Sequence, residues 1–378
     1  MRNWSKCSFV LLAVALTGVS AFGQAPAAAP PPAPPPWSAG PIDFSGLVDG
    51  YYTFNFNHPA SGLNGPGPLN FDAKANQFSL NMAKLTMSHA ADPVGFQVDL
   101  GFGRAFDAIN AEASSAGGVG VKNIEQAYIS YKPSKDKNFQ FDFGKFVTSA
   151  GAEVIESHLN YNYSRSDLFA LAIPYYHFGL RMTGTKGHFT GGVQVVNGWN
   201  NVEDNNSGKT LGFIGNLTGS KASWMNNFYT GPELNGTNKG WRNLYDTTLL
   251  LTPSSKFNAY FNFDYGNQKS PVSGGSSTTW YGIGGAAKFQ MTDKVALTPR
   301  LEWYNDNDGF STFGAELKEF TLTYEYKWAQ GLLTRLEYRH DWADKPVFES
   351  HSSNGGFTAP SDHQDTLAIA FVAFFGPK

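Results

Sequence analysis

Charged side chains at every second position are the most informative chemical feature of this sequence. Between residues 332 and 342 they are Arg335, Glu337, Arg339 and Asp341. The positions between them include the apolar residues Leu336 and Tyr338. Successive side chains of a β-strand point to opposite faces. This spacing therefore places groups that bind water and ions on one face of a strand and apolar groups on the other.

Groups that could carry out catalysis do not follow any recognised pattern. The sequence contains no G-x-S-x-G, G-x-x-x-x-G-K-[ST] or H-E-x-x-H motif. Of eight histidines, only His177 and His340 fall in strand-like segments where burial is plausible, and His177 is expected on the inner face beside Arg181. A general base needs a partner within hydrogen-bond reach, and a lone histidine on such a wall is more often solvated. We therefore predict that the chain is not an enzyme and uses no cofactor.

Metal ligands are equally scarce. Cys7 is the only cysteine. The run from Tyr304 to Gly309 resembles a calcium-binding loop, but its first ligand position holds tyrosine instead of aspartate. Clusters of Asn, Asp and Gly usually form turns. The sequence thus predicts no metal site.

The composition excludes several classes of protein. The 378 residues are 41% hydrophobic, 15% aromatic and only 16% charged, with a formal net charge of −3. So many aromatic residues argue against a disordered chain, and so few charges argue against a nucleic-acid-binding protein. No stretch after residue 23 has 18 consecutive apolar residues, which excludes a helical membrane protein. A transmembrane β-barrel remains consistent with all of these values.

The N-terminal region predicts the compartment. Residues 1–23 have a positive start at Arg2 and Lys6, a short apolar core and small residues where cleavage would occur, as in a secretory signal peptide. Residues 24–41 form an Ala/Pro-rich tract, which we interpret as a periplasmic linker. Residues 42–378 are then the barrel, and we expect the chain in the outer membrane of a Gram-negative cell.

From Ile42 onward we count sixteen segments of about ten residues with a period of two. Short and long connections alternate strictly between them. This predicts an all-β, antiparallel up-and-down transmembrane barrel of about 16 strands, with short periplasmic turns and long external loops. Two places are irregular. Pro299 lies within a segment, where we expect a local bulge, and the period is unclear from Asn81 to Lys84.

Parity assigns equal numbers of acidic and basic residues to the barrel interior. The acidic residues are Asp99, Asp142, Asp246, Asp264, Glu302, Glu325, Glu337 and Asp341. The basic residues are Lys84, Lys132, Arg181, Lys288, Arg300, Lys327, Arg335 and Arg339. We expect the pore wall to be formed by Arg181, Asp264, Arg300, Glu302, Arg335, Glu337, Arg339 and Asp341. A barrel of sixteen strands is wide enough to contain water, so such a wall predicts a hydrated pore with weak ion preference.

The connection 148–173 is the longest and carries an apolar run at residues 168–173. An exposed loop would not need that run, and folding into the barrel would bury it. We therefore predict that this loop narrows the pore, with constriction residues Glu153, Glu156, Arg165 and Asp167. Its acids would then face the wall arginines across a narrow aqueous gap. The alternative is an external cap packed on neighbouring loops.

A resemblance adds to this interpretation. The matching features are Gly144-Lys145-Phe146, Gly151, Glu153, Asn160, Ser164-Arg165-Ser166, Pro174 and Gly179, preceded by DPVGFQVDLGFG at 92–103. On these motifs the chain resembles the OmpL-like outer-membrane β-barrel porin family, β-barrel porin-2. The resemblance implies a single-chain porin fold, a pore and an outer-membrane location. It implies no particular substrate and no catalytic residue.

The predicted function is passive diffusion of small hydrophilic solutes or ions through a water-filled barrel. The alternative is a structural or adhesive barrel whose external loops bind a surface partner and whose lumen is small or plugged. A hydrolase would need a serine–histidine pair that the sequence does not reveal. The expected partners are outer-membrane lipid and the outer-membrane assembly machinery, with no nucleic acid. Trimers are common among sixteen-stranded porins, but no residue pattern here fixes the oligomeric state.

Overall fold

The structure is a computed structural model that describes residues 38–39, 41–65, 71–110, 121–133, 138–311, 314–351 and 358–376. The predicted signal peptide, residues 1–23, and nearly all of the predicted linker, residues 24–41, lie outside these ranges. In the part of the chain that the structure describes, no helix has the length and apolar character needed to cross a membrane.

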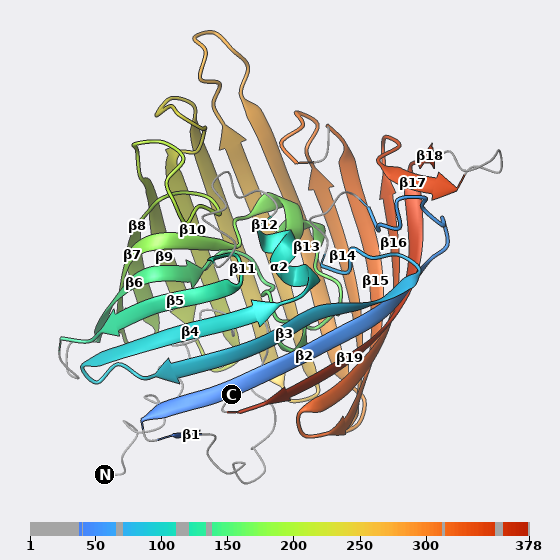
Figure 1. Cartoon of the computed structure of the whole chain (residues 1–378), viewed down its shortest axis with the longest axis horizontal. Helices are drawn as coiled ribbons and strands as arrows, with labels where there is room; N and C mark the ends of the chain where they lie inside the picture. The colour runs from blue at the N-terminus through green and yellow to red at the C-terminus, as the bar shows by residue number, and fades with distance from the viewer. Residues whose placement is uncertain are drawn as a thin grey trace.

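Sixteen antiparallel strands form a closed barrel, which confirms the predicted fold class (Figure 1). The strands are β2 (Ile42–Asn55), β3 (Gln77–His89), β4 (Val94–Phe102), β5 (Ile124–Tyr131), β6 (Phe139–Val147), β7 (Tyr176–Lys186), β8 (Phe189–Val196), β9 (Thr210–Thr218), β10 (Ala222–Pro232), β11 (Trp241–Ser254), β12 (Phe257–Gln268), β13 (Thr278–Gln290), β14 (Val295–Asn305), β15 (Glu316–Ala329), β16 (Leu332–Ala343) and β19 (His363–Phe375). Each pairs with its neighbours in sequence, and β19 closes the barrel on β2.

Three further strands lie outside this ring. The two-residue strand β1 (Ser38–Ala39) pairs with β2, and β17 (Phe348–His351) pairs with β18 (Thr358–Ser361) in the connection between β16 and β19. The helix α2 (Arg104–Ile109) follows β4 and packs with its buried side chains against β3 and β4. Long and short connections alternate around the barrel, so the eight long ones lie at one end.

The two faces of each strand differ in chemistry. On β16, Leu336 and Tyr338 are 46% and 38% exposed on the outside, whereas Arg335 and Arg339 are 0% and 2% exposed on the inside. The same alternation gives the other strands an outward apolar surface suited to hydrocarbon. Closure pairs the backbone of every barrel strand on both sides, which a strand in a bilayer requires because lipid supplies no hydrogen bonds.

The two irregular segments have different explanations. Asn81 is an extra residue between the pairs Asp49–Met82 and Gly50–Leu80, and this bulge between β2 and β3 causes the unclear period. The bulge expected at Pro299 is wrong. The register between β13 and β14 is unchanged across it, and pairing is only interrupted opposite Ala287 and Lys288. Because proline has no N–H, the pairing between β13 and β14 is interrupted at Pro299, but the register of the two strands does not change.

Leu336 tests which face contacts lipid. Replacing it by arginine should lower the free energy of unfolding by about 2–4 kcal/mol if it lies near the bilayer midplane, because a charge would face hydrocarbon. Urea unfolding in lipid vesicles, followed by tryptophan fluorescence, measures the change. Ser255→Arg, at an exposed short turn, is the control and should leave stability nearly unchanged. Equal stability of Leu336→Arg and the parent would contradict the assignment of this face.

Candidate functional site

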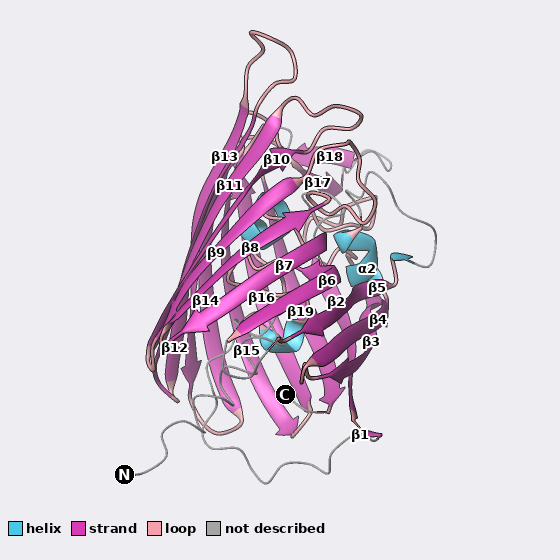
Figure 2. Cartoon of the chain, turned by 90° about the vertical axis from the view of Figure 1, so that its left-hand side faces the viewer, coloured by secondary structure: helices cyan, strands magenta, loops and turns pink. Residues whose placement is uncertain are grey.

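The connection between β6 and β7 lies inside the barrel. We call residues 148–173 of that connection the inner segment. It contains a 3-10 turn, η2 (Ser157–Leu159), and a π-helical turn, η3 (Leu168–Ala172). Figures 1 and 2 show it with α2 inside the outline of the strands. Nearly all of its side chains are buried, and its backbone bonds to inward-facing residues of β10, β11, β12, β14 and β16, so the inward fold is correct and the external cap is not.

The first turn of the inner segment is held by inward side chains on three neighbouring strands, β10, β11 and β12. Asn227 on β10 donates to the carbonyl of Ser149 over 2.9 Å and accepts a hydrogen bond from its hydroxyl over 2.6 Å. Asp246 on β11 accepts the Gly151 N–H over 2.8 Å. Asn262 on β12 accepts the Ala152 N–H over 3.2 Å. These contacts form a clamp of one carboxylate and two amides.

Gly151 is required by the shape of this turn. Its φ of +90° is a conformation that side chains rarely adopt. A Cβ at this position would also lie 2.6 Å from the Cδ1 atom of Ile173, at the other end of the segment. Glycine therefore allows the backbone to reach Asp246 while the two ends of the segment pack together.

The middle of the inner segment is held through its carbonyl groups. Arg335 on β16 donates to the carbonyl oxygens of Ser157, Asn160 and Asn162 over 2.6–2.9 Å. The same guanidinium pairs with Glu325 on β15 at 2.8 Å. A planar guanidinium presents five donors, so one arginine can satisfy several carbonyls that would otherwise be buried without partners.

The next backbone N–H groups along the inner segment donate hydrogen bonds to carboxylates of the wall. Glu337 on β16 accepts the N–H groups of Tyr163 and Ser164 over 2.6 and 2.8 Å. Glu302 on β14 accepts those of Asp167 and Leu168 at the start of η3. Each carboxylate thus receives two consecutive backbone donors, which is a strong, charge-assisted arrangement.

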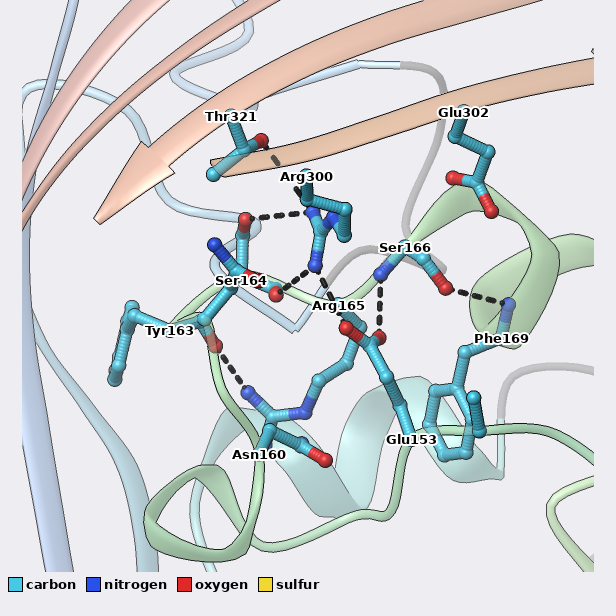
Figure 3. A network of polar contacts seen from close by, with 12 residues as sticks. Glu153, Asn160, Tyr163, Ser164, Arg165, Ser166, Phe169, Arg300, Glu302 and Thr321 are labelled. Atoms are coloured by element: carbon cyan, nitrogen blue, oxygen red, sulfur yellow. Dashed lines mark hydrogen bonds and ion pairs between the residues drawn. The ribbon is translucent and has the colours of Figure 1, made fainter. Parts of the chain in front are cut away.

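Arg300 on β14 joins the segment to the wall at its centre. Its guanidinium pairs with Glu319 on β15 at 2.6 Å and with Glu153 of the segment at 2.8 Å, and it donates to the carbonyl of Ser164 over 2.7 Å. Glu153 also accepts the N–H of Ser166 over 2.6 Å. Figure 3 shows this network, with Arg300 reaching from the wall to Ser164 and Glu153 of the inner segment.

The four predicted constriction residues are all engaged. Glu153 pairs with Arg300, Glu156 with Lys84 on β3, and Asp167 with Arg339 on β16 at 2.7 Å. Arg165 turns back on its own segment, donating to the carbonyls of Val154, Ile155 and Tyr163. The aqueous gap expected between the loop acids and the wall arginines is therefore wrong at these pairs, because direct contacts replace it. Whether these residues narrow a conducting pore stays a prediction.

The apolar run at residues 168–173 is buried, as its composition predicts. Leu168 to Ile173 are buried in a cluster that includes Phe71, Trp280 and Tyr304. The indole N–H of Trp280 on β13 donates to the carbonyl of Ala172 over 3.0 Å. Apolar burial thus holds the last turn of the segment, in contrast to the polar clamp on its first turn.

The remaining predicted wall residues, Asp341, Arg181 and Asp264, lie in three different surroundings. Asp341 pairs with Arg339 at 2.7 Å and so belongs to the same network. Arg181 on β7 pairs with Asp142 on β6 at 2.9 Å, away from the residues that hold the segment, and lies over the ring of Phe146. Asp264 is fully buried opposite Asp246 on the neighbouring strand.

The predicted balance of interior charge is wrong. On the described barrel strands eleven acidic side chains are buried: Asp49, Asp99, Glu125, Asp142, Asp246, Asp264, Glu302, Glu319, Glu325, Glu337 and Asp341. The buried basic side chains number seven: Lys84, Lys145, Arg181, Lys288, Arg300, Arg335 and Arg339. Lys327 has a 41% exposed side chain, and Lys132 follows the end of β5. The interior therefore carries an excess of acid.

Several residues that hold the segment were not identified as site residues. Asp49 on β2 accepts hydrogen bonds from Ser157 and Tyr163, and Glu319 pairs with Arg300. Parity alone would have placed both inside. Asn262 is uncharged, and its role depends on which strand the segment reaches, so no signal in its own segment identifies it.

His177 is buried rather than solvated. It stacks on Tyr229 with 4.8 Å between ring centroids, and its Nδ1 lies 3.0 Å from the carbonyl of Gly198. A cavity of about 10 Å³ adjoins it, with room for one water molecule. Glu233 also lines this cavity, and burial raises the pKa of its carboxyl group. In the part of the chain that is described, no group of three or more His, Cys, Asp or Glu residues could hold a metal ion.

Comparison with protein families assigns the chain. The family described as beta-barrel porin-2, OmpL-like, matches residues 41–375. The match spans all sixteen barrel strands, and the chain belongs to this family. No curated protein sequence matches it.

Solved outer-membrane proteins share the fold at low identity. A high-pH structure of OprB from Pseudomonas putida is 12% identical with a TM-score of 0.57, covering 88% of this chain and 94% of that chain. An anion-selective porin from Comamonas acidovorans is 9% identical with a TM-score of 0.56, covering 88% and 99%. The trimer form of OmpT from Vibrio cholerae is 13% identical with a TM-score of 0.54, covering 89% and 100%. These likenesses show the fold alone.

Arg335 tests how firmly the inner segment is held. Arg335→Ala removes the donors of three buried carbonyls and one partner of Glu325, so it should lower the free energy of unfolding by about 3–5 kcal/mol. It should also make the inner segment sensitive to protease. Arg335→Lys keeps the charge but not the fork of donors, so it should recover only part of the loss. The control Lys318→Ala, on the outer face, should resemble the parent. Protease resistance and full stability in Arg335→Ala would contradict this account.

Proposed function

We propose that this member of the family is a passive outer-membrane channel for small hydrophilic solutes or ions, narrowed by the inner segment. One observation carries the proposal: a sixteen-stranded barrel of a porin family holds an internal segment fixed to its wall by charged side chains. A barrel of this size encloses a wide lumen unless something fills it. The segment supplies that filling and leaves only a restricted path.

The packing around the segment supports a low conductance. Arg300, Glu319 and Arg335 are each 1% exposed or less, so water does not reach the wall where the segment is held. A solute would pass beside this contact or through fluctuations of the segment. The same packing would suit a structural or adhesive barrel with a plugged lumen, and only a measurement of conduction separates these two functions.

The proposal includes a location and a mode of action. The outward apolar surface is suited to outer-membrane lipid, and the chain would reach that membrane through a cleaved signal peptide and the outer-membrane assembly machinery. The long connections other than the inner segment would then face outside. No chemical step is needed for passive transport, so the proposed function is not enzymatic.

Removing the inner segment tests the channel directly. Deletion of residues 152–170 should raise the single-channel conductance in planar bilayers, because it removes the material that fills the lumen. The matched control is deletion of 271–276, in the exposed connection between β12 and β13, which should leave conductance unchanged. If a correctly folded barrel lacking 152–170 conducts no better than the parent, the segment does not restrict the path. If neither protein conducts, the structural alternative is supported.

The acid excess predicts a weak preference for cations. Replacing Glu153 and Glu156 together by glutamine should shift the reversal potential in a KCl gradient toward chloride, because Arg300 and Lys84 each lose a negative partner. The shift should shrink near 1 M salt, where the screening length is about 3 Å. Asp362→Asn, at an exposed rim position, is the control. A reversal potential unaffected by the double substitution would separate these residues from the conducting path.

A further inference from the structure

Two buried aspartates face each other behind the first turn of the inner segment. Asp246 on β11 and Asp264 on β12 are direct cross-strand partners, and both are 0% exposed. Side chains in such positions have Cβ atoms about 4.5–5.5 Å apart. Both alternate with outward apolar residues, including Tyr245 and Phe263, so both point inward.

The two carboxyl groups have very different surroundings. Asp246 accepts three hydrogen bonds, from the N–H of Gly151 at 2.8 Å and from the side chains of Asn227 and Asn262 at 2.8 and 3.1 Å. Neither oxygen of Asp264 has a hydrogen-bond donor among the residues that the structure describes. The carboxyl group of Asp246 is therefore stabilised by three donors, and that of Asp264 by none.

No positive charge compensates the pair. Within the described ranges, neither aspartate forms an ion pair with a basic side chain. Arg300 carries the one guanidinium on β14, and that group is already bound to Glu153 and Glu319. Gly282, opposite Asp264 on β13, offers no charged group. The titratable or charged side chains on the elements packed around the pair include Tyr229 on β10, Tyr260 on β12, Lys288 on β13, Arg300, Glu302 and Tyr304 on β14, and Glu153 and Asp167 on the inner segment. Lys288 is paired with Glu325 at 3.0 Å.

Two adjacent buried carboxylates without a cation are unfavourable, and the simplest remedy is one shared proton. We propose that Asp246 and Asp264 form a proton-binding site: Asp264 is a neutral acid that donates a hydrogen bond to the Asp246 carboxylate. Asp246 keeps the negative charge because its three donors stabilise that form. The proton supplies the one donor that the structure otherwise lacks.

This site acts on the proposed channel through the clamp. Asp246 is the central member of the clamp that holds Ser149, Gly151 and Ala152. Loss of the proton would place two negative charges side by side, and the pair would separate or admit water. The first turn of the inner segment would then loosen, so conductance should rise as pH rises. This step rests on the proposed function, whereas the proton site itself does not.

Infrared spectroscopy tests the proton without requiring conduction. The protein, labelled with carbon-13 in its aspartate carboxyl groups, should show at neutral pH the C=O band of a protonated carboxylic acid. Asp264→Asn should remove that band. Asp246→Asn should shift that band, because the Asp264 acid would then donate to an amide oxygen instead of a carboxylate. Asp43→Asn, at an exposed strand end, should retain it.

The outcomes distinguish the site from its alternatives. A band that is absent from the parent, as it would be if a bound potassium ion balanced the pair, overturns the proposal. A band that persists unchanged in both Asp264→Asn and Asp246→Asn overturns it as well. The two substitutions are independent, so a folding failure in one still leaves the other as a test.

Conductance against pH then tests the coupling. The parent should become more conducting as pH rises, and Asp264→Asn, which keeps a neutral donor, should abolish that dependence. An unchanged pH profile in Asp264→Asn would refute the coupling. If the infrared band behaves as expected but the protein conducts at no pH, the proposed function fails while the proton site stands.

Discussion

The need to satisfy a buried backbone dominates the interior of this barrel. A segment that crosses the lumen carries N–H and C=O groups away from bulk water, and each one that lacks a partner is costly. The wall meets this need with charged side chains. Carboxylates such as Glu302 and Glu337 accept consecutive N–H groups, and Arg335 donates to three carbonyls. The alternating charges of the strands are thus explained first by how the inner segment is held.

A charged lumen wall need not be a hydrated one. A hydrated wall needs only polar groups at its surface, but here the groups are committed to particular backbone atoms. The acids also accept hydrogen bonds from side-chain amides and hydroxyls, as Asp49 does from Asn81, Ser157 and Tyr163. The electrostatic field along any solute path is therefore set by the charges that these contacts leave unneutralised.

The sequence predicted the barrel well because a period of two and alternating connection lengths are local signals. Sixteen strands, the inward position of Arg335 or Glu302, and the burial of residues 168–173 all follow from such signals. The individual contacts between the inner segment and the wall do not follow from local signals. Arg300 meets Glu153 across 147 positions of sequence, and only the three-dimensional path of the segment brings them together. The expected aqueous gap was wrong for this reason, since parity gives direction but not distance. The wrong bulge at Pro299 likewise required knowledge of the register with β13.

The two halves of the inner segment are held by different chemistry, and this limits what a proton can release. From Glu153 onward, the wall contacts involve Arg300, Arg335 and Arg339, which stay charged at any physiological pH, and the last turn is buried among apolar side chains. The first turn has no arginine in its clamp; its only charged member is Asp246. Deprotonation of the aspartate pair would consequently free the first turn alone. The resulting change in conductance should be smaller than that produced by deleting 152–170, because most of the segment remains bound to the wall.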